Sequence, residues 1–321
     1  MTLSVGVDIG GTKIAACAVD RAGTVAHRAL RETPAQDPDA ITVAVADLVE
    51  DLRDQARAGG EAVGALGVAC AGFVDAAGST IVFAANLAWR NEPMQERLEA
   101  ATGLPVILEN DANAAAWGEY RFGAAEDVDD MLLITVGTGI GGGAIIQDRV
   151  LRGAKGFATE VGHLRMVPDG HLCGCGNHGC WEQYASGTAL VRDARELVRA
   201  GGPHASGLAE RCGGDADSLE GVMVTEAALA GDPAAAELFG DVGRKLGEGI
   251  ADLVAVLDPA RIVVGGGVAA AGDLLLDPAR ASFASHLSGR GHRDPAPLVL
   301  AGLGNDAGMV GAADLAVARR G

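Results

Sequence analysis

The feature that most constrains the fold of this sequence is a unit of strand, Gly/Thr-rich turn and strand that occurs twice. In the first copy, the apolar segment 3–9 is predicted to be a buried strand. Gly10, Gly11, Thr12 and Lys13 then form a turn, and a second strand is predicted over 14–19. This copy is therefore a hairpin whose tip carries glycines and a hydroxyl group.

The second copy begins with a predicted strand over 131–136. A glycine-rich turn over 137–143 follows, and the segment 144–147 is predicted to be the returning strand. A third Gly-rich turn, over 265–267, follows a predicted strand at 261–264 and opens into an Ala/Leu-rich helix. The repetition predicts two related lobes that face one cleft.

Helical segments between these strands indicate the fold class. Helices are predicted over 39–58, 187–200, 225–230 and 233–257, with a further strand over 63–71. Alternation of strands and helices is typical of α/β architecture. A chain of 321 residues is long enough for two domains, or for one large fold with two lobes.

Composition excludes several classes of partner. The formal net charge of −18 argues against nucleic acid, because phosphate backbones are bound by basic surfaces. The sequence has no apolar run of membrane length and no signal peptide, so no membrane partner is expected. With six cysteines and no export signal, a reducing cytosol is the expected location.

Three clustered cysteines and a histidine predict a metal site. Cys173, Cys175, Cys180 and His163 offer three thiolates and one imidazole, which is a set typical of closed, structural Zn²⁺ sites. His178 lies in the same segment and is an alternative fourth ligand. The other interpretation, a disulfide or free buried thiols, is disfavoured by the expected location and by the clustering.

Two of the Gly-rich turns suggest phosphate binding. The series Gly137, Gly139 and Gly142 formally matches a dinucleotide-binding fingerprint, but that fingerprint requires a helix directly afterwards, and here a strand is predicted. The Walker A spacing is also missing. We expect instead that the tips at 10–12 and 138–141 hold phosphates through backbone N–H groups and hydroxyls. The simpler alternative is a pair of tight hairpin turns.

Acidic and amide side chains stand where strands end. Asp8 follows the first strand beside its Gly-rich tip, and we expect it to bind phosphate through Mg²⁺; the alternative is an exposed acid at a strand end. Asn110 and Asp111 lie between a strand and an Ala-rich helix, where one of them could simply be an N-cap. Alternatively, Asp111 is a general base toward an alcohol. Asn110, Glu160, His163 and Glu182 would then bind the hydroxyls of a polyol.

These residues carry a resemblance to a known family. The chain resembles the ROK family of sugar kinases and sugar-responsive repressors from the first Gly-rich turn to Gly308, and within it the actinobacterial type of ATP-dependent glucokinase. The most specific part is Glu160-x-Gly162-His163 together with Cys173-x-Cys175-Gly176-x-x-Gly179-Cys180-x-Glu182. The resemblance implies a ribonuclease-H-like, actin-type ATPase fold. It also implies a small lobe at 1–117 with the C-terminal helix 306–321 packed back on it, a large lobe at 118–305 with the zinc segment, and a homodimer or homotetramer.

The resemblance also implies roles for individual residues. Asp111 matches the base that takes the proton from the 6-hydroxyl of glucose as the γ-phosphoryl group of ATP is transferred. His163 matches the zinc-ligand position. The positions matching sugar ligands are Asn110, Asp111, Glu160, His163 and Glu182, with Gly72 and Asn86 as further candidates. The positions matching the nucleotide site are Asp8, Gly10, Gly11, Thr12, Lys13, Thr138, Gly139 and Gly141 for phosphate and metal, and Gly265, Gly266 and Gly267 for adenosine.

Two rival functions are considered. A sugar-sensing repressor would need an N-terminal helix-turn-helix, for which a first strand beginning at Leu3 leaves no room. A kinase for fructose, mannose or an N-acetylhexosamine would use the same motifs, because these sugars present similar hydroxyls. The motifs do not say whether polyphosphate can replace ATP.

Overall fold

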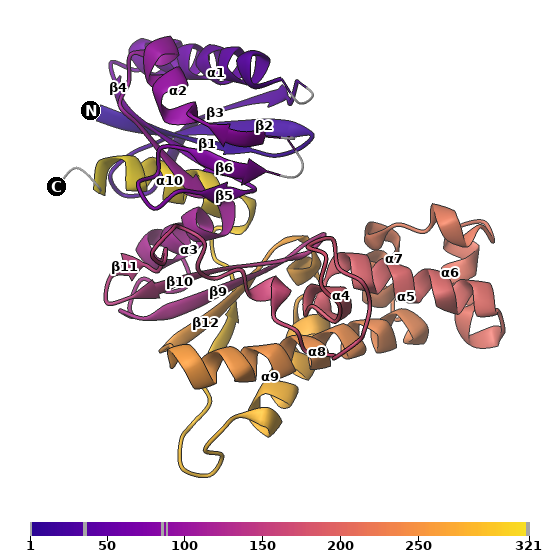
Figure 1. The fold of residues 1–321 in the computed structure, drawn as a ribbon. Coiled ribbons are helices and arrows are strands. Elements are labelled where there is room, and N and C mark those ends of the chain that lie inside the picture. The colour runs from indigo at the N-terminus through magenta and orange to yellow at the C-terminus, as the bar shows by residue number, and fades with distance from the viewer. Residues whose placement is uncertain (1, 35–36, 85–86, 88, 319–321) are drawn as a thin grey trace. The chain divides into compact units, whose positions relative to one another are not determined.

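The structure is a computed structural model, shown in Figure 1, that describes residues 2–34, 37–84, 87 and 89–318. Asn86, a candidate sugar ligand, lies outside the described residues. The strands are β1 Thr2–Ile9, β2 Lys13–Val19, β3 Val25–Glu32, β4 Ala62–Cys70, β5 Phe73–Val74, β6 Ile81–Ala84, β7 Trp89–Glu92, β8 Val106–Asn110, β9 Met131–Val136, β10 Ile140–Ile146, β11 Arg149–Val150, β12 Arg261–Gly265 and β13 Leu298–Leu300. The α-helices are α1 Pro38–Ala58, α2 Met94–Thr102, α3 Asp111–Phe122, α4 Glu182–Ala185, α5 Gly187–Ala200, α6 Ser206–Arg211, α7 Gly221–Leu229, α8 Pro233–Leu257, α9 Asp273–His286 and α10 Ala307–Ala318.

The chain divides into two compact units. Unit 1 comprises Met1–Leu133, Gly143–Thr159 and Ala301–Gly321, and unit 2 comprises Ile134–Gly142 and Glu160–Leu300. The expected boundary after residue 117 falls inside α3, which continues to Phe122 and packs closely on α10. A Cβ atom at Gly311 of α10 would lie 1.8 Å from the carbonyl oxygen of Ala114 in α3.

The central sheet of unit 1 has the order β3-β2-β1-β4-β8. β1 and β2 form the expected hairpin, antiparallel with Ile9 opposite Ile14. β4 is parallel to β1, and β8 is parallel to β4. Because parallel strands end at the same edge of a sheet, this order collects the residues that follow β1, β4 and β8.

Both faces of this sheet are covered by helices (Figure 1). On one face, Val45, Leu48 and Leu52 of α1 are fully buried in one apolar cluster with Val5 and Val7 of β1. On the other face, α10 lies directly on the backbone of β1 and β4. A Cβ atom at Gly6 or Gly67 would lie 1.8 Å from a carbonyl oxygen of α10, so only glycine allows this contact.

The second sheet has the order β11-β10-β9-β12-β13. β10 begins at Ile140, four residues earlier than expected, and Gln147 lies beyond its end with φ 50°. Gly141 is therefore in a strand and not at a turn, and the tip that joins β9 to β10 consists of residues 137–139. The third Gly-rich turn leads first into a 3₁₀ helix, Gly267–Ala271, and then into α9.

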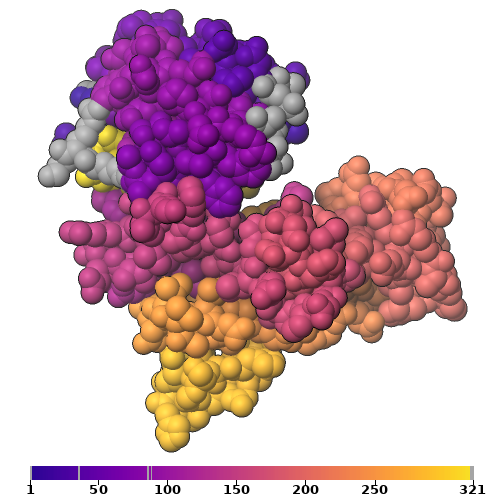
Figure 2. Space-filling model, viewed as in Figure 1, coloured from indigo at the N-terminus to yellow at the C-terminus, as the bar shows by residue number. Residues whose placement is uncertain are grey.

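The loop between α9 and β13 projects from unit 2, and is the lowest part of the surface in Figure 2. Within the described residues, no helix is both long and apolar enough to cross a membrane.

Candidate functional site

In unit 1, two carboxylates flank the end of β4. Ile9 is in register with Cys70, and Cys70 with Asn110, so Asp8 and Asp111 stand at the ends of the two strands on either side of β4. Burial raises the pKa of the Cys70 thiol, and the charges of Asp111 and Asp8 raise it further. Both carboxylates are therefore close enough to influence the Cys70 thiol at this edge of the sheet. α/β proteins commonly bind ligands at such an edge.

The junction between β8 and α3 fixes the orientation of Asn110. Its Oδ1 accepts a hydrogen bond from the backbone N–H of Asn113 at 3.1 Å, so Asn110 is the N-cap of α3. Its Nδ2 donates to the carbonyl oxygen of Gly72 at 3.2 Å, which brings these two candidate sugar ligands together. Asp111 is the first helical residue, and its Oδ1 accepts from the N–H of Ala112 at 2.9 Å.

The tip of the β1–β2 hairpin is held by its neighbours and is open to solvent. The N–H of Gly10 donates to the carbonyl oxygen of Lys13 at 3.0 Å. The hydroxyl of Thr33 donates to the carbonyl oxygen of Gly10 at 2.7 Å. Gly11, Thr12 and Lys13 are exposed.

Asp8 has the environment of a carboxylate that binds a cation. Burial raises its pKa, and the nearby positive charge of Lys13 opposes that rise. A half-buried carboxylate beside a Gly-rich turn suits Mg²⁺, which commonly takes one protein carboxylate, waters and phosphate oxygens.

In unit 2, the expected metal ligands meet. His163, Cys173, Cys175 and Cys180 each offer one ligand atom, and these atoms lie within 4.8 Å of one another. The Sγ atoms of Cys175 and Cys180 are 3.6 Å apart, and Sγ of Cys173 is 3.6 Å from Nδ1 of His163. Tetrahedral zinc with Zn–S bonds of about 2.3 Å requires ligand separations of about 3.5–3.8 Å, so the donor set fits the ion. His178 lies outside this cluster, and its Nδ1 is 2.9 Å from the carbonyl oxygen of Gly170.

Glu182 connects the thiol cluster to the β9–β10 tip. Its Oε1 accepts from the thiol of Cys173 at 2.9 Å and lies 3.7 Å from Nδ1 of His163. Its Oε2 would lie 2.5 Å from a Cβ atom at Gly139, so the approach requires glycine there. Burial raises the pKa of Glu160. The charge of His163 lowers this pKa, and the charge of Glu182 raises it further. Glu160, His163 and Glu182 therefore lie in one electrostatic neighbourhood.

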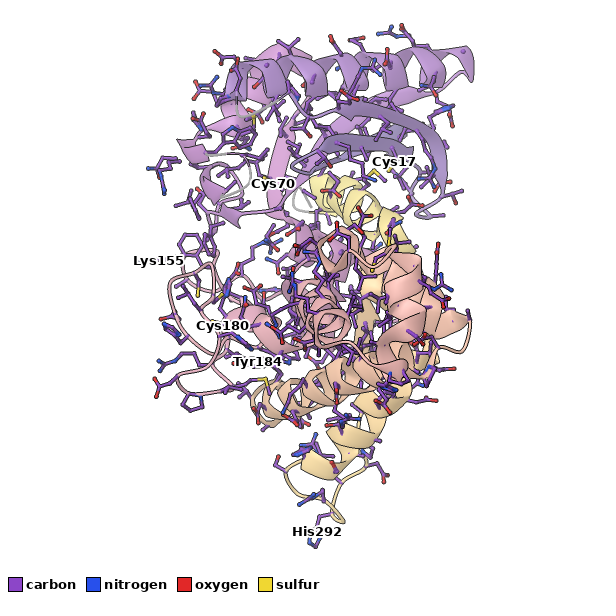
Figure 3. The ribbon with its side chains drawn as sticks, turned by 90° about the vertical axis from the view of Figure 1, so that its right-hand side faces the viewer. Cys17, Cys70, Lys155, Cys180, Tyr184 and His292 are labelled. Carbon is purple, nitrogen blue, oxygen red and sulfur yellow. The ribbon has the colours of Figure 1, made fainter. Side chains whose placement is uncertain are left out.

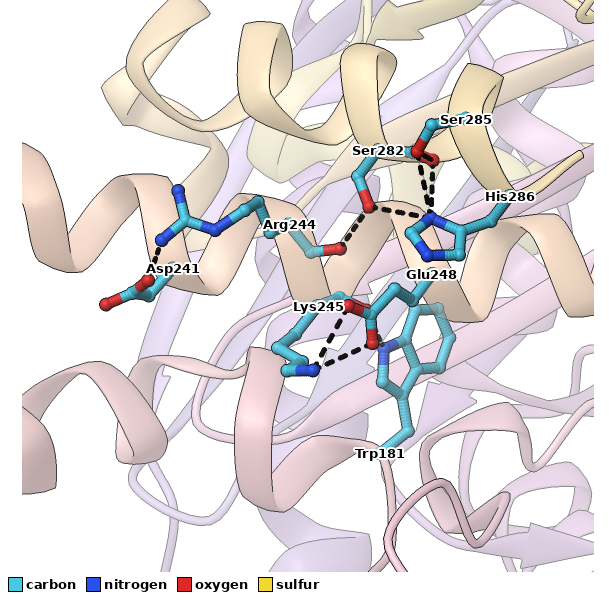
Figure 4. A network of polar contacts seen from close by, with 8 residues as sticks. All are labelled: Trp181, Asp241, Arg244, Lys245, Glu248, Ser282, Ser285 and His286. Atoms are coloured by element: carbon cyan, nitrogen blue, oxygen red, sulfur yellow. Dashed lines mark hydrogen bonds and ion pairs between the residues drawn. The ribbon is translucent and has the colours of Figure 1, made fainter.

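Trp181 anchors this segment to α8 (Figure 4). The fully buried indole donates from Nε1 to the carbonyl oxygen of Lys245 at 2.8 Å. Gly249 provides the space, because a Cβ atom there would lie 2.3 Å from the indole ring. Trp181 stands between Cys180 and Glu182, so the anchor fixes a candidate metal ligand and a candidate sugar ligand together.

A pocket of about 910 Å³ lies wholly within unit 2. It runs from the β9–β10 tip along α5 to α7, and its walls are mainly apolar, with threonines and arginines among them. The described lining residues are Gly137, Thr138, Gly187, Thr188, Leu190, Val191, Arg192, Arg195, Arg199, Gly221, Val222, Thr225, Gly267, Val268 and Ala270. A volume of this size suits a nucleoside.

Of the residues expected on the nucleotide side, only some line this pocket. Thr138 and Gly267 do, whereas Gly139, Gly141, Gly265 and Gly266 are not among its described lining residues. Gly266, at φ 87°, instead packs on β9, where a Cβ atom would lie 2.5 Å from the carbonyl oxygen of Val136.

The helix predicted over 187–200 is confirmed as α5, but the sequence did not predict that its first residues contact the β9–β10 tip. The N–H of Gly187 donates to the carbonyl oxygen of Gly137 at 2.7 Å. The hydroxyl of Thr188 donates to the backbone carbonyl oxygen of Thr138, also at 2.7 Å. The helix start thus fixes the β9–β10 tip. The signal was Ser186, whose hydroxyl caps α5 by accepting from the N–H of Ala189, because serine before a helical segment is a typical N-cap.

The family of the chain is shown by its similarity to known proteins. Residues 4–319 match the ROK family. The chain belongs to the ROK family. It is 49% identical to a glucokinase of Streptomyces coelicolor over 98% of each chain. Among solved structures, it is similar to a ROK family glucokinase from Streptomyces griseus in complex with glucose and AMPPNP, with a TM-score of 0.88, 48% identity and coverage of 99% of this chain and 100% of that one.

The family also contains regulators. A ROK family transcriptional regulator, described as a homologue of the E. coli MLC protein, matches 99% of this chain with a TM-score of 0.86 and 26% identity. The match covers 78% of the regulator. These similarities confirm the α/β, actin-type ATPase fold that the sequence predicted.

Proposed function

We propose that this ROK protein is an ATP-dependent glucokinase, which transfers the γ-phosphoryl group of ATP to the 6-hydroxyl of glucose. The observation that carries the proposal is the placement of Asp8 and Asp111 at the ends of the two parallel strands that flank β4, in a chain that matches glucokinases along its whole length. Phosphoryl transfer needs a positioned acceptor and stabilisation of charge on the phosphate. Asp111 and Asp8 meet these two needs.

Asp111 is the proposed general base, and it receives the proton of the 6-hydroxyl as that oxygen attacks phosphorus. Asn110 holds the junction in place through its N-cap and through Gly72. Nδ2 has two hydrogens, so one remains for a sugar hydroxyl after the bond to Gly72. Glu160, His163 and Glu182 are proposed to bind the remaining hydroxyls, and Asn86 stays a further candidate.

For the donor, we propose that the 910 Å³ pocket receives the nucleoside, with Gly265, Gly266 and Gly267 shaping its approach. The tips at 10–13 and 137–139 and Gly141 would lie along the phosphates. Asp8 would hold Mg²⁺, which when bound neutralises charge on the phosphate oxygens. Backbone amides must contribute here, because a chain with net charge −18 has few basic groups to spare.

We propose that zinc at His163, Cys173, Cys175 and Cys180 is structural. Four protein ligands leave no position for water, so such an ion would fix the segment that carries Glu160, His163 and Glu182. His163 presents Nδ1 to the cluster, which leaves Nε2 for a sugar hydroxyl. We also propose a cytosolic homodimer or homotetramer; within the described residues all six cysteines are free, in line with a reducing location.

The test is a panel of sugars assayed with ATP and Mg²⁺, with the product analysed for phosphate at the 6-position. Glucose should give the highest kcat/KM. Faster turnover of fructose, mannose or an N-acetylhexosamine would keep the kinase and replace the acceptor. No sugar-dependent ADP release with any of them would refute the enzyme, and a sugar-sensing regulator would become the better explanation.

A further inference from the structure

An ion pair between the buried Glu109 and the partly buried Arg152 lies next to the proposed catalytic junction and has no part in the chemistry described so far. Glu109, the residue before Asn110, is 4% exposed. Its Oε2 accepts a hydrogen bond from Nε of Arg152 at 2.7 Å, and Nη2 of Arg152 lies 2.6 Å from the same oxygen. Burying two charges has a high desolvation cost, so such a pair alone is weak evidence for a role in stability.

The second oxygen of Glu109 extends the contact to α3. Oε1 accepts from the backbone N–H of Asn110 at 3.2 Å and from Nδ2 of Asn113 at 3.2 Å. Asn113 is only 1% exposed, and its Oδ1 is 3.3 Å from the hydroxyl of Thr159. A continuous series of polar contacts therefore links Arg152, Glu109, Asn113 and Thr159.

Thr159 is held in an unfavourable backbone conformation directly before Glu160. Its φ is 67°, a left-handed value that β-branched residues rarely adopt. Such strain persists only where surrounding contacts hold it, and it is concentrated at functional positions. The hydroxyl contacts of Thr159 to Asn113 and to the carbonyl oxygen of Ala158 at 2.5 Å hold the residue here.

The loop from Arg152 to Thr159, which carries Lys155 labelled in Figure 3, is fastened to unit 1 at two further points. Gly156, at φ 93°, packs against β5, where a Cβ atom would lie 2.1 Å from the carbonyl oxygen of Val74. The ring of Phe157 packs on Phe73, with centroids 5.1 Å apart. These contacts hold the loop to the rest of unit 1 in the residues directly before Thr159.

We propose that Glu109 and Arg152 are positioning residues for sugar recognition. The carboxylate of Glu109 holds the end of β8, where Asn110 and Asp111 lie. Through Asn113 it also holds Thr159, the residue directly before Glu160. The pair therefore sets the geometry of hydroxyl contacts from two segments that are distant in sequence. This inference rests on the proposed function, and it assigns the pair to sugar affinity and to discrimination between epimers.

The experiment compares Glu109→Gln and Arg152→Lys with Glu119→Gln. Glu119 is a matched control: it is fully buried, and its oxygens accept backbone N–H groups of Ala124, Gly302 and Leu303 at 2.8–2.9 Å, without any candidate site residue. For each variant, kcat and KM are measured with glucose and mannose, and Tm is recorded. Lys keeps the charge of Arg152 but not its two-pronged geometry.

We expect Glu109→Gln to raise KM for glucose about 10- to 100-fold, because misplacement by about 1 Å can have effects of that size. The ratio of kcat/KM for glucose to that for mannose should fall, and Arg152→Lys should give an intermediate change. Glu119→Gln should lower Tm and leave KM and the ratio as in the wild type.

Two results would overturn the inference. If Glu109→Gln and Arg152→Lys change Tm but change neither KM nor the ratio of kcat/KM for glucose to that for mannose, the pair serves stability alone. If Glu109→Gln does not fold, Arg152→Lys decides by the same criterion. An inactive wild-type chain would instead refute the proposed function, and the inference with it, so the two failures are distinguishable.

Discussion

The two carboxylates of unit 1 that we propose as cation ligand and general base, Asp8 and Asp111, have different environments. Asp8 is half-buried at the end of β1, with a pKa raised by burial and only partly lowered by Lys13. Asp111 stands in the first turn of α3, where the helix N-terminus favours negative charge. The first arrangement suits the proposed cation site, and the second places the proposed base where the helix N-terminus favours a negative charge.

Replacing Asp111 by Asn should remove the base and keep the shape of the junction. We expect kcat to fall about 10²- to 10⁴-fold, the usual contribution of a general base. Asn110 still caps α3, so Tm should change little. Steady-state kinetics with a circular-dichroism melt tests this. Near-normal turnover in the folded variant would exclude Asp111 as the base.

Asp8→Asn should stabilise the free protein while it removes activity. The folded pKa of Asp8 is above its unfolded value, so the ionised carboxylate weakens the fold at neutral pH. This penalty is absent below the unfolded pKa and grows as pH rises through the folded pKa. Tm without Mg²⁺ should therefore exceed that of the wild type at pH 7, and the difference should disappear near pH 4. Turnover should fall about 10²-fold or more, as when one preorganised electrostatic contact is lost. A variant less stable than the wild type at pH 7 would contradict the argument.

At the level of elements, the sequence predicted regular strands and helices well and predicted close packing poorly. The β1–β2 hairpin was predicted correctly because apolar strands flank a short Gly-rich turn. β10 was placed too late, because Gly141, Gly142 and Gly143 have no side chains to show a strand pattern. Gly143 is required by tertiary contact: a Cβ atom there would lie 2.6 Å from the carbonyl oxygen of Ala112 in α3. No local pattern reveals such a neighbour.

The anchor of the cysteine segment on α8 gives a test at this scale. Trp181→Phe keeps most of the ring but leaves the carbonyl oxygen of Lys245 without its indole donor, which should cost about 1–3 kcal/mol. KM for glucose should rise as well, because Cys180 and Glu182 flank the residue. Trp117→Phe is the matched control, since that indole donates to Asp314 at 2.8 Å in unit 1. Equal losses of Tm with unchanged KM in both variants would show that the anchor serves stability alone.

Removing one thiol of the cysteine cluster tests whether bound zinc supports glucose binding. Cys175→Ser is expected to lose bound zinc, measured by elemental analysis, and to weaken glucose binding in parallel, because the segment carrying Glu160, His163 and Glu182 loses its clamp. Cys212→Ser, outside the cluster, should retain both properties. Glucose affinity that persists in a zinc-free Cys175→Ser protein would break the link between metal and sugar.

On the scale of the whole molecule, the proposed sites are distributed between the two units. Asp8, Asn110 and Asp111 belong to unit 1, whereas the cysteine cluster and the 910 Å³ pocket belong to unit 2. The sequence indicated both groups through their motifs, and of the pocket walls it indicated Thr138 and Gly267 but not the residues of α5 and α7. α5, α7 and the 3₁₀ helix Gly267–Ala271 are far apart along the chain, and their shared cavity arises only from tertiary packing.

This distribution predicts that adenosine alone and the complete set of ATP analogue, Mg²⁺ and glucose protect different elements from hydrogen exchange. Under the proposed assignment, adenosine occupies the pocket of unit 2 and lacks the phosphates that the turn at 10–13 and Asp8 are proposed to bind. In hydrogen exchange, adenosine should slow the amides of α5 and α7 and leave those of β1 and α3 unchanged, because a ligand protects the elements that it stabilises. ATP analogue, Mg²⁺ and glucose together should protect amides in both units. Equal protection of both units by adenosine alone would show that the nucleoside does not act through this pocket, and the donor site would have to be assigned elsewhere.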